Sequence, residues 1–323
     1  MRGYKLDLKD MKILYELEQD PKITLSKLAK NVKISRQVAD YRINKLKQHA
    51  IYAFYPIIDV GRLGYSVFRI HLRIKSSSKE VHQKFAKELF KEYKTFWVAF
   101  MSGSFDIIVD IFAKTPNEFE ETLAKIIQKN KEIIQNYETF PILSLTLYDY
   151  GYFLEKKQEK KTHTIQKNLE NMKLDEIDKK IIDIIKYDYK TPYIKIGQRV
   201  DLSRNAVKHR IKNLEKNKII AGYKVFVNFE IFNKQAFKIF ITYDNSKIEQ
   251  EKGLLNYLKS IKGVLATLKL LGKWNLDIEI QSENVRELQD FLIELRTKFD
   301  IIESYEIAQI IEDFKIDFHP DKL

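Results

Sequence analysis

The chain has 323 residues, of which 44% are hydrophobic and 32% charged, and its excess of Lys and Arg over Asp and Glu gives a formal net charge of +12. This hydrophobic content excludes a disordered chain, ten glycines and six prolines exclude a collagen-like one, and the lack of cysteine excludes disulfides, thiolate metal sites and cysteine nucleophiles. We find no start typical of a signal peptide and no run of about 18 apolar residues, so we expect a cytoplasmic protein without a membrane segment, whose charge is compatible with nucleic-acid binding.

The sequence contains an internal repeat. Residues 6–23 align without a gap with residues 174–191, and this offset of 168 holds for about 50 residues. After one inserted residue the match resumes at an offset of 169, at which Gly103 aligns with Gly272. Two unrelated segments would not keep one register for so long, so we infer a tandem duplication of a unit of about 150 residues.

Each copy begins with a helical segment. In the first copy, apolar residues at helical spacing predict a helix from about residue 8 to 18, and Thr24 starts a second, shorter helix. Ser35 is suited to cap a third helix that runs to about Gln48, because its hydroxyl can accept a hydrogen bond from an amide of the first turn. Three helices of which the last two are joined by a short turn are typical of a helix-turn-helix.

The third helix of each copy has a polar outer face. On a helical wheel Ala39, Ile43 and Leu46 form the buried stripe of the first copy. Gln and Asn suit paired hydrogen bonds to base edges, and Lys and Arg suit guanine or phosphate. Segment 33–48 carries five basic residues and one acidic residue, and segment 201–218 carries six and two. The residues that we predict to bind DNA are Ser35, Arg36, Gln37, Tyr41, Arg42, Asn44, Lys45, Ser203, Arg204, Asn205, Lys208, His209, Arg210 and Lys212.

These residues follow the pattern of a known family. The first helix carries L-D-x-x-D-x-x-I-L from Leu6 to Leu14, the second carries L-A-x-x-V, the third begins after [IL]-S and contains R-I-x-x-L, and an apolar strand follows. In this the chain resembles the leucine-responsive regulatory protein/AsnC family, over nearly its whole length and twice. The resemblance implies an N-terminal DNA-binding module joined to a C-terminal module for effector binding and oligomerisation. The duplication departs from the usual single copy.

After each helical segment the apolar period changes to that of strands. The order strand, helix, strand, strand, helix, strand predicts a ferredoxin-like module, an antiparallel sheet with both helices on one face. The uncovered face would expose Val67, Trp97 and Phe112, and such a face needs a partner sheet. In the family this partner is another copy, so we expect the modules to pair within the chain or between chains. The predicted ranges are 65–75, 78–93, 95–102, 105–113, 117–130 and 133–148 in the first copy, and 236–244, 247–260, 263–271, 275–281, 284–298 and 301–313 in the second.

We therefore predict an α+β fold in which two (winged) helix-turn-helix modules alternate with two ferredoxin-like β-α-β-β-α-β modules. The stretch between the copies is charged and has no hydrophobic period, which indicates a linker with some helix. The predicted segments are a helix-turn-helix DNA-binding domain at 1–55, a ferredoxin-like effector and oligomerisation domain at 56–153, the charged linker at 154–173, a second helix-turn-helix domain at 174–224 and a second ferredoxin-like domain at 225–323.

A hairpin between the two central strands of the first module reads Ser-Gly-Ser-Phe-Asp, residues 102–106. It resembles the G-x-[FYW]-D turn of the family, near which small effectors such as amino acids bind. The second copy has Asn275 in place of the aspartate, and an ordinary turn stabilised by that aspartate is the interpretation we favour for these residues. The residues that would bind an effector are Gly103, Ser104, Phe105, Asp106, Gly272 and Trp274.

The sequence shows no phosphate-binding loop, dinucleotide fingerprint, G-x-S-x-G or H-E-x-x-H motif, and no two of its six histidines have metal-binding spacing on one helix. We therefore expect no catalytic residue, metal site or cofactor. Siroheme decarboxylases, which share the architecture of the family, are the enzyme alternative. They would be expected to have functional histidines in the α/β part, where His71 is matched by Phe240. A co-regulator that oligomerises but binds DNA weakly is a further alternative, because the carboxylate of Asp40 would repel phosphate.

The sequence thus predicts a sequence-specific DNA-binding transcription regulator. Its partners would be double-stranded DNA, an amino-acid-like effector, and itself through the ferredoxin-like modules. The outer faces of the two third helices differ and cannot read the same bases, so the operator should be an asymmetric pair of half-sites. Because its face is the more basic, the second copy should contribute more of the salt-dependent affinity.

Overall fold

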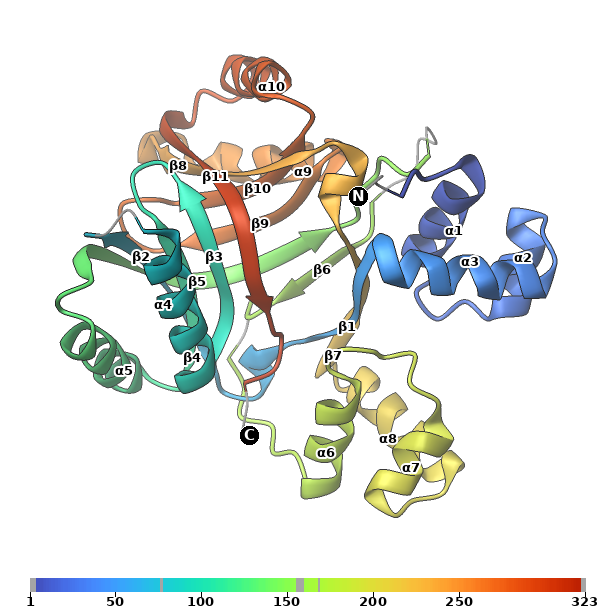
Figure 1. Cartoon of the computed structure of the whole chain (residues 1–323). Coiled ribbons are helices and arrows are strands. Elements are labelled where there is room, and N and C mark those ends of the chain that lie inside the picture. Colours follow the sequence, from blue (N-terminus) through green and yellow to red (C-terminus); the bar gives the residue numbers. More distant parts are fainter. Residues whose placement is uncertain (1–3, 76–77, 155–159, 168, 321–323) are drawn as a thin grey trace.

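A computed structural model describes residues 4–75, 78–154, 160–167 and 169–320. Two small helical modules lie on one side of a larger body of strands and helices, and a pair of strands runs between them (Figure 1). Within the described ranges, none of the helices is long and apolar enough to cross a membrane.

The first helical module is a helix-turn-helix of three capped helices. They are α1 (Leu8–Gln19), α2 (Leu25–Val32) and α3 (Arg36–His49), close to the predicted ranges. Asp7 caps α1 in a capping box, in which its side chain accepts from the Asp10 amide and the Asp10 side chain accepts from the Asp7 amide. The predicted cap of α3 is confirmed, since the Ser35 hydroxyl accepts a hydrogen bond of 3.2 Å from the Val38 amide.

The second helical module repeats this arrangement. It comprises α6 (Glu176–Ile185), α7 (Tyr193–Val200) and α8 (Arg204–Lys216). Asp175 and Ser203 cap α6 and α8 at the places where Asp7 and Ser35 cap α1 and α3. The duplication in the sequence is therefore also a duplication of helix-turn-helix structure.

A strand follows each helix-turn-helix, and these two strands pair with each other. β1 (Ile51–Ile58) and β7 (Ile220–Val227) run antiparallel, with Ile51 opposite Val227 and Ile58 opposite Ile220. The domain boundaries placed from the sequence at 55/56 and 224/225 fall inside these two strands. The resulting ribbon links the two copies at the base of their helix-turn-helix modules.

Both α/β modules have the predicted β-α-β-β-α-β order. The main difference is at the predicted helix 247–260, which begins as a 3-10 helix and continues as a shorter α-helix. The first copy contains η1 (Val60–Arg62), β2 (Ser66–Ile74), α4 (Lys79–Glu92), β3 (Thr95–Ser102), β4 (Ile107–Ala113), α5 (Pro116–Lys129) and β5 (Ile134–Tyr148). The second contains η2 (Phe229–Phe232), β8 (Gln235–Tyr243), η3 (Asn245–Gln250), α9 (Glu251–Ser260), β9 (Val264–Leu270), β10 (Leu276–Ser282), α10 (Val285–Lys298) and β11 (Ile302–Ile316).

The strands of the two modules close one barrel. The strand order is β2-β4-β3-β11-β8-β10-β9-β5, and β5 also pairs with β2. β5 and β11 are each 15 residues long. The first part of each pairs within its own copy and the last part pairs with the other copy, β5 with β9 and β11 with β3. Of the two pairings that the sequence left open, the structure shows the one within the chain.

Apolar side chains from both copies fill the barrel. Val67, Trp97 and Phe112, predicted on an uncovered sheet face, are buried there together with Phe240 and Leu268 of the second copy. Helices α4 and α5 pack on the outer side of the first copy's strands, and α9 and α10 pack on that of the second (Figure 1). Each apolar sheet face therefore has its partner inside the same chain.

A charged cluster lies within this apolar interface. Arg69 donates hydrogen bonds of 2.7 Å to both carboxylate oxygens of Asp110 and also contacts Asp277 of the second copy. Lys238, which takes the place of Arg69 in the second copy, lies 2.8 Å from a carboxylate oxygen of Glu279. Charges inside a protein are costly unless paired, and here each basic side chain has an acidic partner.

The stretch 154–173 between the copies contacts the body of the molecule. Residues 155–159 and 168 lie outside the described residues. Of the others, Thr162–Ile165 form β6, which pairs with the end of β5, and Lys160 and Gln166 are buried. The described part of this stretch is thus a strand with ordered flanks, where the sequence predicted a linker with some helix.

Candidate nucleic-acid interface

The outer face of α3 carries most of the first-copy residues predicted to contact DNA. Ala39 and Leu46 are buried against the core of the module, as the helical wheel predicts. Tyr41 on the outward face is open to solvent, with 64% of its surface exposed. The exposed predicted side chains on this helix are Arg36, Gln37, Tyr41 and Asn44.

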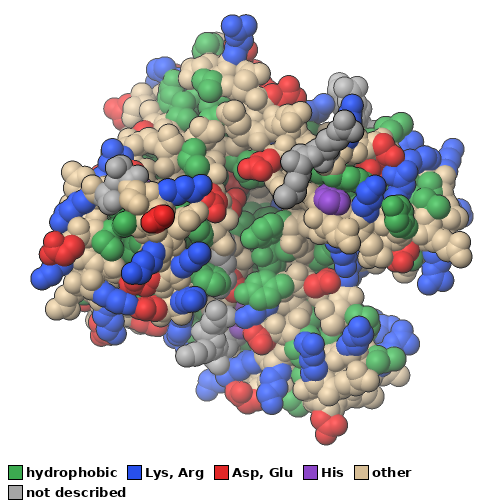
Figure 2. Space-filling model, viewed as in Figure 1, with side chains coloured by type: hydrophobic (Ala, Val, Ile, Leu, Met, Phe, Trp, Pro, Cys, Tyr) green, Lys and Arg blue, Asp and Glu red, His purple; other side chains and the backbone are tan. Residues whose placement is uncertain are grey.

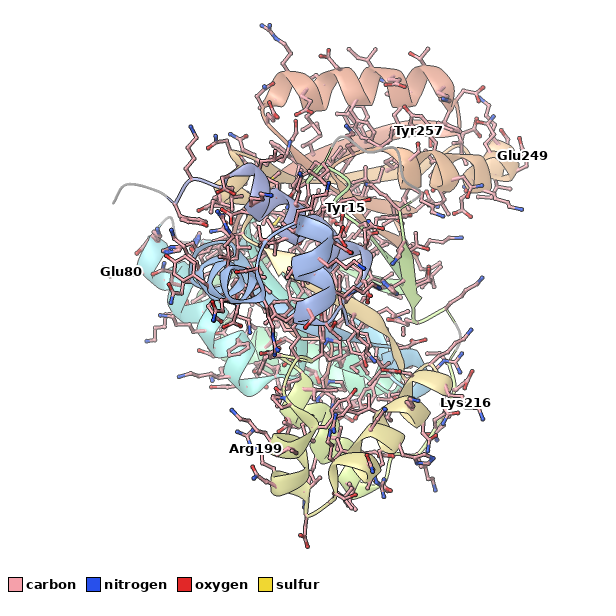
Figure 3. The ribbon with its side chains drawn as sticks, turned by 90° about the vertical axis from the view of Figure 1, so that its right-hand side faces the viewer. Tyr15, Glu80, Arg199, Lys216, Glu249 and Tyr257 are labelled. Carbon is pink, nitrogen blue, oxygen red and sulfur yellow. The ribbon has the colours of Figure 1, made fainter. Side chains whose placement is uncertain are left out.

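The outer face of α8 is similar in shape but more basic. Lys208 and Lys212 occupy the places that Asp40 and Asn44 occupy in α3. Lysine and arginine side chains extend from both helix-turn-helix modules in Figure 2, and Figure 3 shows Arg199 of α7 and Lys216 of α8 at the surface of the second module. The exposed predicted side chains on this helix are Arg204, Asn205, Lys208, His209 and Lys212.

Two of the predicted DNA-binding residues instead form ion pairs within their own module. Arg42 donates hydrogen bonds of 2.8 Å to Asp7 and 2.7 Å to Asp10 in α1. Arg210 contacts the corresponding pair, Asp175 and Asp178, at 2.6 and 2.9 Å. These arginines tie the third helix to the first, so the structure gives them a positioning role.

Three other predicted residues also have intramolecular contacts. The hydroxyls of Ser35 and Ser203 each accept a hydrogen bond of 3.2 Å from an amide in the first turn of their helix. Lys45 is half-buried, and its ammonium lies 4.8 Å from the ring centre of Tyr4. Wheel positions alone could not reveal these contacts, because their partners come from other elements or from the cap geometry.

The two helix-turn-helix modules touch each other. Lys22 of the first forms an ion pair with Glu215 of the second, and the Tyr189 hydroxyl donates a hydrogen bond of 3.0 Å to the Pro21 carbonyl. A groove of about 690 Å³ opens between the modules. Its lining includes Asp40, Asn44 and Lys47 of α3 with Lys190, Tyr193 and Arg204 of the second module. One edge of the polar face of α3 therefore borders the second module.

The two hairpins that resemble effector turns are held by their acidic or amide residue. Asp106 accepts a hydrogen bond of 2.8 Å from the Ile74 amide, and Asn275 accepts one of 2.8 Å from the Tyr243 amide. The glycines of the hairpins have φ angles of 137° and 131°, a region that favours glycine. The change from Asp to Asn thus preserves the bond that holds the turn, which accords with the ordinary-turn interpretation of Asp106.

A cavity of about 70 Å³ lies between these hairpins. Four buried polar atoms at its wall have no hydrogen-bond partner among the described residues: both ring nitrogens of His71, Nε1 of Trp274 and Oε1 of Glu306. Buried polar atoms are seldom left unpaired, so this arrangement suits a small polar ligand.

His71 and Glu306 were not among the residues predicted to bind an effector. Burial and then the nearby Arg69 hold the pKa of His71 well below its ordinary value, so the imidazole is neutral near pH 7 and offers one donor and one acceptor. A signal was present in the sequence, because a histidine in one copy is matched by Phe240 in the other. The position of His71 beside the hairpin of the second copy depends on the closed barrel, and the sequence did not predict that barrel.

Two segments of the chain match known DNA-binding domains. Residues 6–47 match the AsnC-type helix-turn-helix domain, and residues 174–221 match a winged helix-turn-helix DNA-binding domain. The HTH-type transcriptional regulator FL11 of Pyrococcus furiosus is 29% identical over 121 residues, which are 37% of this chain and 78% of that protein. The first helix-turn-helix is thus similar to AsnC-type domains, and part of the chain is similar to HTH-type transcriptional regulators. A further relative, the HTH-type transcriptional regulator LrpA of Pyrococcus horikoshii, is 40% identical over 55 residues, 17% of this chain and 39% of LrpA.

With two helix-turn-helix domains and relatives that are transcriptional regulators, the chain is a DNA-binding transcription regulator. A solved structure with the same fold is that of the siroheme decarboxylase NirDL, with 14% sequence identity and a TM-score of 0.63. The superposition covers 95% of this chain and 92% of NirDL. At this level of identity the likeness shows the shared fold alone.

Proposed function

We propose that both helix-turn-helix modules bind DNA and that they read two different half-sites within one operator. The observation that carries this proposal is the pair of exposed, unlike faces on α3 and α8. Amide side chains suit paired contacts to adenine, and lysines suit guanine or phosphate. The side chains proposed to contact DNA are Arg36, Gln37, Tyr41, Asn44, Arg204, Asn205, Lys208, His209 and Lys212.

A single chain then contains two DNA-binding modules, which a symmetric regulator obtains by pairing two chains. Because the α/β modules already pair inside the chain, the two third helices are present in one molecule and differ in sequence. A symmetric dimer reads a palindrome, whereas this chain should prefer an operator without two-fold symmetry. The proposal places the protein in the cytoplasm with the DNA that it regulates, and further self-association of whole chains is compatible with it.

Selection of bound duplexes from a random pool at defined salt tests this function. We expect enrichment of two unlike half-sites at a constant separation. Enrichment of a palindrome would contradict the asymmetric reading, and enrichment of no sequence would contradict sequence-specific binding. Enrichment of one half-site alone would favour a different role for one module. In that case the first module would be the weak one, because Asp40 lies on its face where Lys208 lies in the second.

We propose further that the chain acts without catalysis. The cavity at His71 measures about 70 Å³, which is far too small to admit a tetrapyrrole. A second NirDL structure is a complex with an iron-uroporphyrin III analogue, and it covers 96% of this chain at 15% identity. Titration with siroheme should therefore leave the absorption spectrum of the pigment unchanged. A shifted spectrum with release of carbon dioxide would establish the decarboxylase alternative.

The cavity between the hairpins is the proposed site for an amino-acid-like effector. The Trp274 indole N–H can donate to a carboxylate, and the unpaired oxygen of Glu306 can accept from an ammonium group. Calorimetric titration with each of the twenty amino acids, followed by operator binding in their presence, tests this role. Trp274→Phe keeps an aromatic ring but removes the N–H, so it should weaken binding of an active amino acid. If no amino acid binds, the hairpins serve as turns only.

A further inference from the structure

Glu18 near the end of α1 contacts the segment that leaves the barrel in its own copy. Its side chain is buried and accepts a hydrogen bond of 2.6 Å from the backbone amide of Tyr150, just beyond the end of β5. The corresponding residue of the second copy is Lys186, whose ammonium lies 2.8 Å from Asp183 within its own helix. The first helix-turn-helix is therefore attached to the barrel through Glu18, whereas the second is attached through the Tyr187 hydroxyl, which donates a hydrogen bond of 3.1 Å to Asp317 beyond β11.

Tyr150 also binds the strand that leads out of the second helix-turn-helix. Its hydroxyl accepts a hydrogen bond of 3.1 Å from the Val227 amide at the end of β7. Its carbonyl accepts one of 3.2 Å from the Gly263 amide beside β9. The buried Lys224 of β7 donates to the Tyr148 carbonyl. One short segment thus joins α1, β7 and the second α/β module.

Lys160, after the undescribed residues 155–159, closes this junction from the other side. Its ammonium donates to the carbonyls of Ile261 at 2.5 Å and Val264 at 3.0 Å, and the residue is buried. Gly151 has a φ of 71°, and a Cβ there would lie 2.7 Å from Cε of Lys160. The positive φ favours glycine at this position, and the segment passes directly over the Lys160 side chain.

The helix-turn-helix modules are held against each other as well. β1 pairs with β7, Lys22 pairs with Glu215, and Tyr189 binds the Pro21 carbonyl. These contacts fix the edge where the modules meet, and Glu18 ties the same end of α1 to the barrel. If the two unlike helix-turn-helix modules are fixed relative to each other, they can bind two half-sites only at one separation and one relative rotation about the duplex axis.

We propose that the Glu18–Tyr150 contact positions the first helix-turn-helix, so that the chain binds only duplexes whose two half-sites stand at one spacing and one helical phase. This inference rests on the proposed function, because it assumes that both modules bind DNA. Glu18 is a positioning residue, since it acts through the placement of α3 without touching DNA. Inserting about five base pairs between half-sites rotates one by roughly half a turn, which a fixed pair of modules cannot follow.

The test measures the affinity of the full chain for selected operators whose spacers are lengthened by one to ten base pairs. We expect wild type to lose at least tenfold in affinity at about five added base pairs. The affinity of Glu18→Ala should fall less than threefold across the series of spacers. Its affinity for an isolated half-site should equal that of wild type. Glu18→Gln keeps an acceptor for the Tyr150 amide and should restore the spacing preference. Lys186→Ala, at the matching place in the second copy, should behave as wild type.

Lys160→Met provides a second route to the same result if Glu18→Ala does not fold. It leaves α1 unchanged but removes the bonds to Ile261 and Val264, and it should also flatten the spacing response. A wild-type chain that binds all spacers equally would overturn the inference while leaving the proposed function intact. Folded Glu18→Ala and Lys160→Met that both keep the wild-type preference would overturn it too. A wild-type chain that binds no duplex would instead overturn the proposed function, and the inference with it.

Discussion

Arg42 of α3 donates a hydrogen bond of 2.7 Å to the buried carboxylate of Asp10 in α1. Arg210 and Asp178 repeat this contact at 2.9 Å in the second copy. The bond ties the third helix of each module to the first, and in both modules the cap residue before the first helix shares the same guanidinium. Basic residues on the third helix thus divide into those that hold the helix and those that face outward.

Loss of Arg42 should destabilise the chain more than loss of Arg210. In Arg42→Met the side chain of Asp10, which is 2% exposed, keeps the Tyr4 hydroxyl but loses its charged partner, and we expect a cost of about 2 to 3 kcal/mol. Asp178 is 22% exposed, so Arg210→Met should cost about 1 kcal/mol. Urea denaturation followed by circular dichroism measures both. Equal and small losses would show that neither pair holds its helix.

Lys208→Ala and Lys212→Ala should weaken DNA binding at every sequence. Each exposed ammonium that neutralises a phosphate releases counterions, so removing one should lower the slope of log affinity against log salt by about one. Fluorescence anisotropy on the selected operator and on unrelated DNA, from low to moderate salt, gives both quantities. Lys125→Ala, an exposed lysine of α5 outside the helix-turn-helix modules, is the control and should change neither. Unchanged slopes in both variants would remove this face of α8 from the interface.

His71→Phe should stabilise the chain in the absence of a ligand. The imidazole is buried without a hydrogen-bond partner among the described residues, and Phe occupies this place in the second copy. Removing an unpaired buried polar group should gain about 1 to 2 kcal/mol, measured by urea denaturation. The reverse change Phe240→His is the matched control and should destabilise. A loss of stability in His71→Phe would mean that the imidazole is hydrogen-bonded in solution, for example by water in the cavity.

Sequence patterns predicted most of the secondary structure, because helix caps and hydrophobic periods depend only on residues close together in the chain. Asp7 and Ser35 are cap residues in the sequence and caps in the structure, and the helix and strand periods gave the order of elements in both modules. The barrel could not be predicted in the same way. A strand period shows that β5 has a buried face, but it does not show that the end of β5 pairs with β9 of the other copy. β6 was missed because its four residues are too few for a period to be visible.

The candidate DNA interface was partly predictable for the same reason. Exposure of Gln37 and Lys208 follows from the helical wheel, which needs only the sequence. The engagement of Arg42 follows from a carboxylate 32 residues earlier in the chain, and no spacing rule links the two. The Glu18–Tyr150 contact spans 132 residues and depends on the closed barrel, so it could be seen only in the folded chain.

The pH dependence of stability should contain a contribution from Glu18. Burial and then the nearby carboxylate of Asp149 raise the pKa of Glu18 to about 7, against the opposing effects of Lys224, the Tyr150 amide and Lys160. The ordinary pKa of this carboxyl is 4.5, so between pH 4.5 and about 7 the folded chain holds a proton that the unfolded chain has released. The contribution is complete below pH 4.5 and is lost as pH rises through about 7, by at most about 1.4 kcal/mol per pH unit.

Glu18→Gln separates this contribution from all others. Gln does not titrate, yet its carbonyl can still accept the hydrogen bond from the Tyr150 amide. The unfolding free energy of wild type minus that of the variant, measured in urea at steps from pH 4.5 to 6.5, should therefore fall steadily. Lys160, whose pKa burial lowers to about 7, changes stability in the opposite sense, rising with pH above this window. Parallel curves for the two proteins would show that Glu18 is ionised throughout, which would require the ammonium groups of Lys160 and Lys224 to outweigh burial.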